Sequence, residues 1–527
     1  MHFTTHDQLL LMALLGMLAA FLIAAPVLRV PYPIFLVLGG LALGFVPGIP
    51  TIALPPEVVL VAVLPPLLYL SAYRTSLRDL RANARAIGIL AVGLVIATTV
   101  TVAVVAHAAI TGLPWSAAFA LGAVVAPTDP IAATAIMRRL GVSRRLVSII
   151  ESESLVNDGT ALVLLRVAVV AAVSGRFSYW DVSWRLVWAI VGGIGIGLVA
   201  GFVVAQVRRR VDNPPVEVTI SLMTGYFAFI PATAVSASGV ISVVTAGVYL
   251  GWRTPELTSV QSRLQGEALW NIVAFVLNAL VFALVGLQLS RILDTLTGRS
   301  AGELTRYGLL VTGTVIATRI LWLPVFTHLP RLLPGVSRPV KPFSHTFLIS
   351  WAGMRGAVSL AAALAIPLAT NAGGPFPDRD LIIFLTFCVI LGTLVVQGLS
   401  LPTLIRAMRM EPDHTEEEED ARARIRAAEA AIERLDELLD EEWVREDTAE
   451  RLRGLYGFRV NRFSSRFDEN ADGAIEEQSQ AYQRLRRELL DAERAAVTQL
   501  GRDGEISGDV VTRVRRDLDL DDARLDI

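Results

Sequence analysis

The sequence has few charged residues, one lysine and one cysteine. Only 18% of its 527 residues are charged, whereas 53% are hydrophobic. The single Cys388 excludes an internal disulfide framework and a cysteine metal site, and there is no Gly-x-x-x-x-Gly-Lys loop to bind nucleotide phosphates. We find no histidine cluster, no nucleophile paired with a base and no basic patch. These absences argue against a primary pump, an enzyme and a nucleic-acid-binding protein, and we expect no cofactor.

The formal net charge of −2 is the sum of two opposite parts. Residues 1–410 carry a net charge of +12, and residues 411–527 carry −14. Charged residues fill 52 of the last 117 positions but only 44 of the first 410. Ordinary soluble folds do not keep so long a segment so poor in charge. We therefore predict an all-α polytopic membrane domain over residues 1–410 and a charged, helical C-terminal domain over residues 411–527.

Thirteen apolar stretches are long enough to cross a bilayer. The first, Leu9–Ala25, precedes the first basic residue, Arg29, so it lacks the basic start of a signal peptide and is predicted to be retained. Numbered in chain order, the spans fall near residues 8–26, 32–46, 57–72, 87–111, 116–137, 147–173, 184–207, 215–234, 236–252, 267–289, 305–328, 343–369 and 380–405.

The loop charges give these spans a direction. Nineteen Arg and Lys residues follow odd-numbered spans, and six follow even-numbered ones. Because positive residues favour the cytoplasmic side, we expect the N-terminus outside, the C-terminal tail in the cytoplasm and the chain in the inner (plasma) membrane. A miscounted span would destroy this alternation, which therefore supports the count of thirteen.

Ionisable residues inside spans are functional candidates, because a charge in lipid is costly unless it is paired or hydrated. Asp129 lies in span five, within Ala126-Pro127-Thr128-Asp129-Pro130. Two prolines three residues apart cannot both fit an intact helix. We expect a broken helix with free carbonyl groups, a feature that commonly forms ion sites in transporters. The alternative is a simple proline kink capped by Asp129.

Span six carries a narrow polar stripe. At about 100° per residue, Glu151, Ser154 and Asp158 share one helix face, and Glu153 and Asn157 form the adjacent strip. Such a stripe is typical of a helix that faces a hydrated cavity. Glu151 lies near the helix end, where neighbouring arginines would pair with it, whereas Asp158 lies deeper and is the better candidate.

Two arginines lie inside later spans. Arg355 in span twelve needs a buried partner, and we predict an ion pair with Glu153 to which Asn157 also bonds. Arg319 in span eleven is expected to have a similar structural role, but the sequence does not identify its partner.

Spans five and twelve are both disrupted, and they lie seven spans apart. An odd offset between two repeats inverts the second one in the membrane. We therefore predict that spans one to six and eight to thirteen are inverted repeats, with two broken helices crossing mid-membrane at the ion site.

Five segments together resemble the bacterial sodium/proton antiporters of the first monovalent cation:proton antiporter family. The resemblance covers about residues 8–408 and leaves the tail outside. The segments are Ala126-Pro127-Thr128-Asp129-Pro130-Ile131-Ala132, Glu153-Ser154-Leu155-Val156-Asn157-Asp158, Gly353-Met354-Arg355-Gly356-Ala357-Val358, Leu64-Pro65-Pro66-Leu67-Leu68 and Ala317-Thr318-Arg319.

The resemblance implies a homodimer of thirteen-helix protomers, each with a dimer half and a mobile core half. It makes Glu153 and Arg355 the structural ion pair, and it points to the electroneutral branch, which exchanges one cation for one proton. The residues that it implies for cation and proton binding are Asp158, Asp129, Asn157, Ser154 and Thr128, and all of them except Asn157 would hold Na⁺.

The chemistry of the residues agrees with this resemblance. Burial disfavours a charged carboxylate and a bound cation favours it, so a proton and a cation compete for Asp158. Hydroxyl and carboxylate oxygens suit a small, hard cation. We predict a secondary transporter that exchanges Na⁺ or Li⁺ for protons by alternating access, for pH and sodium homeostasis. Two alternatives remain: a K⁺/H⁺ or broad monovalent cation/H⁺ antiporter, and a cation channel.

Apolar residues at helical spacing in the tail predict helices that pack on each other, on the basic loops or on a partner tail; a solvated charged face is the alternative. Asp468–Ile475 match the first eight positions of a calcium-binding loop. Position twelve, however, is Ser479 instead of Glu, and there is only one such loop. The sequence therefore argues against a calcium site.

Overall fold

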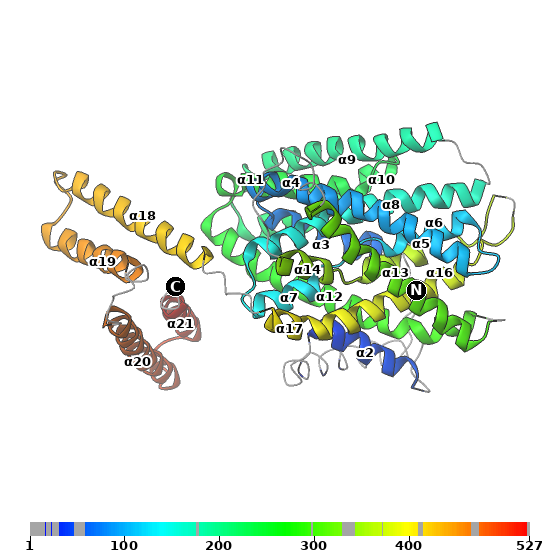
Figure 1. Ribbon diagram of the computed structural model, residues 1–527. Helices are drawn as coiled ribbons and strands as arrows, with labels where there is room; N and C mark the ends of the chain where they lie inside the picture. Colours follow the sequence, from blue (N-terminus) through cyan, green and yellow to red (C-terminus); the bar gives the residue numbers. More distant parts are fainter. Residues whose placement is uncertain are drawn as a thin grey trace. The chain divides into compact units, whose positions relative to one another are not determined.

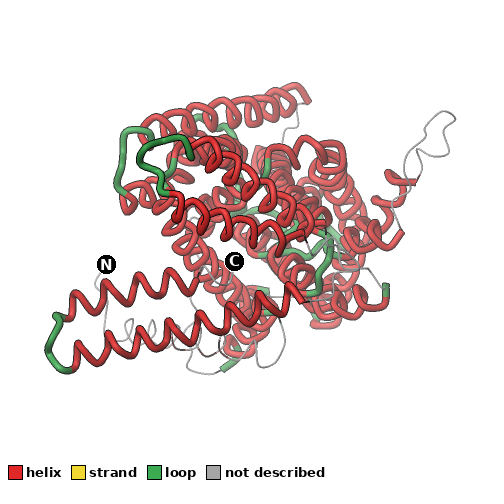
Figure 2. The backbone as a smooth tube through the Cα atoms, turned by 90° about the vertical axis from the view of Figure 1, so that its left-hand side faces the viewer, coloured by secondary structure: helices red, strands yellow, loops and turns green. Residues whose placement is uncertain are grey.

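The computed structural model describes residues 31–46, 58–174, 179–296, 299–328, 343–371, 373–408, 415–464 and 474–523, with three isolated positions before residue 31. These residues form helices joined by loops, as Figure 2 shows, and the described part of the chain contains no strand. The chain divides into two compact units, Met1–Pro412 and Asp413–Ile527. Span one, apart from these three positions, and the calcium-like segment 468–473 lie outside the described residues.

The other twelve predicted spans coincide with helical elements of the first unit. Among the described residues, seven helices are long and apolar enough to cross a membrane, so the full count of thirteen remains a prediction. In chain order the elements are α2 (Tyr32–Gly44), η1 (Val58–Val63), α3 (Leu64–Arg74), α4 (Leu77–Gly88), η2 (Ile89–Leu94), α5 (Val95–Ala109), α6 (Trp115–Val125), α7 (Ile131–Arg139), α8 (Arg144–Ser174), α9 (Tyr179–Arg208), α10 (Pro214–Ala234), α11 (Gly239–Leu257), α12 (Val260–Thr295), α13 (Ala301–His328), α14 (Phe343–Trp351), α15 (Ala357–Leu364), α16 (Arg379–Gly392), η4 (Thr393–Gln397) and α17 (Gly398–Ala407).

Two clusters of buried apolar side chains divide the first unit into halves. One cluster joins α3, α9, α10 and α11, which neighbour one another in Figure 1. The larger cluster joins α2, α5 to α8 and α13 to α17. Helix α12 contributes Trp270 to the first cluster and Phe282 to the second. This long helix therefore connects the two halves.

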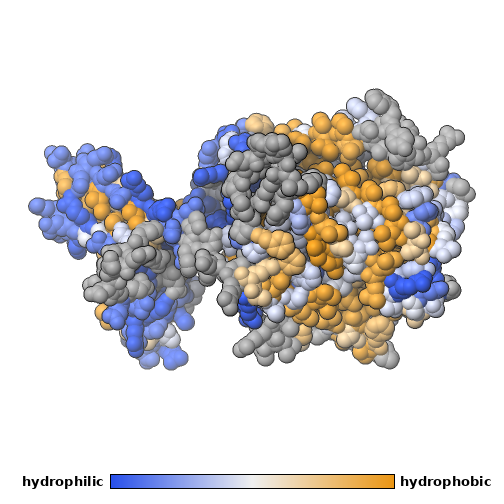
Figure 3. Space-filling view, in the orientation of Figure 1, coloured by the Kyte–Doolittle hydropathy of each residue, from blue (hydrophilic) through white to orange (hydrophobic). Residues whose placement is uncertain are grey.

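Large apolar side chains also cover the outside of the first unit. Val199 and Phe202 on α9 are more than half exposed, and apolar residues dominate the visible surface of this unit in Figure 3. Exposed apolar area of this extent is typical of a surface that contacts lipid.

Two helix breaks interrupt the packed helices of the larger cluster. Residues 126–130 separate α6 from α7, and residues 352–356 separate α14 from α15. Pro127 and Pro130 explain the first break, because neither ring fits an uninterrupted helix. The second break contains no proline but has glycines at both Gly353 and Gly356.

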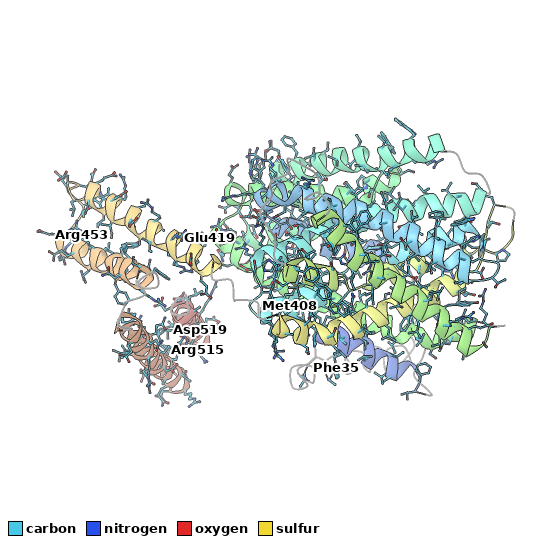
Figure 4. The ribbon with its side chains drawn as sticks, viewed as in Figure 1. Phe35, Met408, Glu419, Arg453, Arg515 and Asp519 are labelled. Carbon is cyan, nitrogen blue, oxygen red and sulfur yellow. The ribbon has the colours of Figure 1, made fainter. Side chains whose placement is uncertain are left out.

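The second unit contains the helices α18 (Thr415–Leu438), α19 (Glu446–Ser464), α20 (Ala474–Arg502) and α21 (Gly508–Ala523). Arg494 on α20 joins the last two helices through ion pairs with Asp519 at 3.0 Å and Asp522 at 2.8 Å. Figure 4 labels Asp519 on α21. The hydrogen bond from Arg494 lowers the pKa of the Asp522 carboxyl below its usual value. The contact is therefore strongest when Asp522 is ionised.

We predict that Arg494→Ala accelerates amide hydrogen exchange across residues 508–523 at neutral pH, because α21 loses both ion pairs. In the unchanged protein the protection persists above the unfolded Asp pKa of about 3.9. The protection falls as the pH drops through the lowered pKa of Asp522 in the folded protein, because the ion pair stabilises α21 only while this carboxylate is ionised. Arg426→Ala, which removes an exposed pair with Glu429 on α18, is the control. Equal exchange in both variants would contradict the prediction.

Candidate functional site

The two helix breaks meet inside the first unit. The backbone N–H of Asp129 donates to the carbonyl of Met354 at 2.8 Å. The Asp129 carboxylate in turn accepts from the N–H of Ile131 at 2.9 Å, which satisfies the first backbone N–H group of α7. The prediction that the two disrupted helices approach each other is therefore confirmed, and Asp129 takes part in the junction with both its backbone and its side chain.

Helix α8 places its polar stripe against the first break. The Ser154 hydroxyl donates to the carbonyl of Thr128 at 3.0 Å, and the Asn157 amide donates to the Thr128 hydroxyl at 2.8 Å. Thr128 also donates to a carboxylate oxygen of Glu153 at 3.3 Å. Proline rings remove helical hydrogen bonds at the break. The α8 side chains replace part of them by bonding to the carbonyl and the hydroxyl of Thr128. Asn157 therefore bonds to Thr128, not to an arginine pair as predicted.

Glu153 forms its ion pair with Arg319 of α13, and the predicted pair with Arg355 is wrong. The two Arg319 terminal nitrogens lie 2.5 and 2.8 Å from the two Glu153 oxygens. Both side chains are buried, at 0% and 1% exposure. Arg319 also donates to the carbonyl of Ile349 near the end of α14. The pair is bidentate, because the two nitrogens of one guanidinium bond to the two Glu153 oxygens.

Arg355 instead donates to backbone carbonyl groups beside the breaks. Its Nε lies 3.1 Å from the carbonyl of Val125, the last residue of α6, and its Nη1 bonds to the carbonyl of Gly353. Its backbone N–H donates to the Thr393 hydroxyl at 3.1 Å. The end of a helix presents carbonyl groups that lack intrahelical partners and carry partial negative charge. These carbonyls accept the hydrogen bonds of the buried Arg355, which forms no ion pair with a described carboxylate.

The two glycines of the second break make room for side chains of the site. A methyl group at Gly353 would overlap the Arg319 side chain, and one at Gly356 would overlap the Asp129 carboxylate. Gly356 has φ −134°, so it is required for space and not for a left-handed backbone. These two glycines therefore allow two charged side chains to approach the backbone of the break closely.

Asp158 lies one helical turn beyond Ser154 on α8. Its side chain is 5% exposed, and no described residue donates a hydrogen bond to it. Its carboxylate interacts electrostatically with Asp129. Asp158 is thus a buried acid with free lone pairs beside a second carboxylate. The hydroxyl oxygens of Thr128 and Ser154 lie at the first break as well. Oxygen groups of these kinds are ligands for hard cations.

Glu151, a secondary candidate, lies away from this junction. Its carboxylate pairs with Arg138 on α7 at 2.6 Å, and both side chains are partly or largely exposed. The expectation of an arginine partner near the helix end is confirmed, and the partner is Arg138. Glu151 is therefore a surface residue of α8.

We predict that Arg319→Met lowers the free energy of unfolding by about 3–5 kcal/mol, because it leaves Glu153 as an unpaired buried charge. The double variant Arg319→Met/Glu153→Leu should recover most of this loss. Denaturation in detergent measures both. Arg138→Met, which removes the exposed pair with Glu151, should change stability by less than about 1 kcal/mol. A loss of equal size in Arg138→Met would show that burial is not the cause.

The family model described as sodium/hydrogen exchanger, transmembrane, matches residues 10–407. An uncharacterized Na⁺/H⁺ exchanger of Mycobacterium tuberculosis is 39% identical over 505 residues, which cover 94% of this chain and 92% of the relative. A sodium, potassium, lithium and rubidium/H⁺ antiporter of Bacillus subtilis is 34% identical over 387 residues, which cover 71% of this chain and 58% of the relative.

A solved structure is also similar in fold. The sodium proton antiporter of Methanocaldococcus jannaschii matches with a TM-score of 0.58 at 19% identity, covering 75% of this chain and 98% of that one. The fold likeness and the sequence relatives agree with the family match. The chain belongs to the sodium/hydrogen exchanger family of membrane cation/proton antiporters, and it is a transporter, not an enzyme.

Proposed function

We propose that this protein exchanges Na⁺, and also Li⁺, for protons at a single site centred on Asp158. The observation that carries the proposal is the state of this carboxylate: it is buried, it accepts no hydrogen bond from a described residue, and it neighbours Asp129. Neighbouring acids such as Glu153 and Glu151 have arginine partners. Asp158 is left to take its positive partner from solution.

Competition between the two substrates follows from this environment. Burial opposes a bare carboxylate, so Asp158 is stable either with a proton or with a cation but not empty. Carboxylate oxygens of Asp158 and Asp129 and hydroxyl oxygens of Thr128 and Ser154 supply ligands for the cation. Alternating access of the loaded site then exchanges one substrate for the other without a further coupling device.

The proposed stoichiometry is one cation for one proton. Asn157 precedes Asp158 in the position where a second acid would add a second titratable charge, and its amide is instead bonded to Thr128. The Glu153–Arg319 pair is neutral as a unit. One titrating carboxylate carries either one proton or one Na⁺, so its net charge is the same in both loaded states. Exchange is then electroneutral.

The cellular setting is proposed from the sequence. The excess of arginine in alternate loops supports an N-terminus outside, a cytoplasmic C-terminal unit and thirteen spans in the inner membrane. The resemblance to known antiporters supports a homodimer. In this setting the exchanger would serve pH and sodium homeostasis.

A broader cation range is the second candidate function. The Bacillus subtilis relative is named for transport of sodium, potassium, lithium and rubidium. The proposed ligands are two neutral hydroxyl groups and two carboxylates. This ligand set does not by itself exclude the larger K⁺ from the site. A cation channel is less well supported, because paired broken helices around a buried site are typical of transporters.

We predict that Asp158→Asn abolishes cation-driven proton flux in proteoliposomes that contain a pH-sensitive dye. The variant cannot exchange a proton for a cation at this position. Asp380→Asn, at an exposed acid in the first turn of α16, should keep normal flux. Addition of Na⁺, Li⁺ and K⁺ in separate runs distinguishes the two candidate functions. Normal flux through Asp158→Asn would contradict the proposal.

We further predict that Gly356→Ala lowers the exchange rate at least about tenfold, because the added methyl group displaces the Asp129 carboxylate. The backbone at this position accepts alanine, so the protein should still fold. Gly313→Ala on α13, where nothing lies within 4 Å of the new methyl group, is the matched control. An unchanged rate in Gly356→Ala would remove Asp129 from the proposed site.

A further inference from the structure

One face of the last membrane helix, Arg379–Ala407, packs against the second break. Thr393, Gln397 and Ser400 are spaced by four and three residues, so they share a helix face. The Thr393 hydroxyl accepts from the backbone of Arg355 at 3.1 Å, and the Ser400 hydroxyl accepts from the Trp351 indole at 2.9 Å. Gln397 lies between these two contacts and therefore faces the middle of the break, residues 352–354.

A second contact supports this placement. A methyl group on the neighbouring Gly398 would lie 3.6 Å from the Met354 sulfur. The same part of the helix, Thr393–Gln397, has π-helical hydrogen bonding, a local widening that is frequent at functional sites. The helix is thus irregular where it contacts the break.

The Gln397 amide is buried without a partner. Its side chain is 0% exposed, and neither its oxygen nor its nitrogen has a hydrogen-bond partner in the described part of the chain. Arg355 Nη2, on the same break, is likewise buried and unpaired. Buried amide groups without hydrogen bonds are rare because they are costly. A small polar ligand that bonds to them removes this cost.

We propose that Gln397 holds a buried water molecule against the second break, and that this water helps to position the transport site. Water fits because the amide offers one donor group and one acceptor group, and water complements both. The unpaired guanidinium nitrogen of Arg355 repels a cation and donates to a water oxygen. A second cation site is therefore disfavoured here.

The link to transport runs through the backbone of the break. Met354, which borders the Gln397 helix, accepts the hydrogen bond from the Asp129 backbone at 2.8 Å. A water bonded between Gln397 and the break fixes the Met354 carbonyl and, through it, Asp129. Gln397 is in this sense a positioning residue. This second part rests on the proposed function, whereas the water site does not.

Gln397→Met tests both parts, because methionine has a similar unbranched shape and no hydrogen-bonding amide. The experiment compares thermal unfolding of the full chain in detergent with Na⁺-dependent proton flux in proteoliposomes. Thr386→Val is the control: Thr386 is a fully buried polar residue of the same helix, and its hydroxyl bonds within its own helix to Ile382. A high-resolution map of the unchanged protein gives an independent measurement.

We expect Gln397→Met to lower the melting temperature by about 2–4 °C and to raise the apparent KM for Na⁺ about threefold or more. The maximal rate should change less, and Thr386→Val should leave KM unchanged. A higher melting temperature in Gln397→Met would overturn the water site, since removal of an unsatisfied amide stabilises a protein. A lower melting temperature with unchanged KM would overturn the positioning role.

The remaining outcomes are also decisive. If Gln397→Met does not fold, density for a water within hydrogen-bond distance of the Gln397 amide supports the site, and its absence at a resolution that shows other buried waters overturns it. If the unchanged protein exchanges no monovalent cation, the proposed function fails, while unfolding and the map still decide the water site.

Discussion

A bilayer offers no water to backbone N–H and C=O groups, so a helix broken inside it must satisfy those groups with other parts of the protein. The two breaks of this exchanger do so in large part through each other and through neighbouring side chains. Asp129 donates its backbone N–H to Met354, and Arg355 donates to Val125 at the end of α6. Ser154 and Asn157 complete the first break from α8. The positions of Thr128, Asp129, Ser154 and Asn157 depend on this junction.

The same constraint requires a partner for each charged side chain inside the unit. Glu153 and Arg319 neutralise each other, and Arg355 is held by carbonyl groups at helix ends. Asp129 caps α7 with one carboxylate oxygen. Asp158 accepts no hydrogen bond from a described residue, although it is also buried. Under the proposed function Asp158 is the exchanging acid, because an acid already paired within the protein has nothing to exchange.

Much of this organisation could be predicted from the sequence. The proline spacing at Pro127 and Pro130 predicted the first break, and the polar periodicity of residues 151–158 predicted a helix with one polar face. The structure places that face against the break. The partner of Glu153 could not be predicted, because Arg319 and Arg355 are both single arginines in apolar spans. Only the three-dimensional path of α13 brings Arg319 to Glu153, while Arg355 turns toward the carbonyls of the break. The roles of Thr393 and Gln397 left no sequence signal, since isolated polar residues in a span are common.

A proton and a cation that compete directly for one carboxylate cannot both occupy it, so binding of one must release the other. Calorimetric titration of the detergent-solubilised protein with Na⁺, in buffers of different ionisation enthalpy and over a series of pH values, measures this release. We expect about one proton to be released for each Na⁺ bound at low pH, falling toward zero as the pH rises and the site loses its proton beforehand. Sodium binding that releases no proton at any pH would contradict this competition.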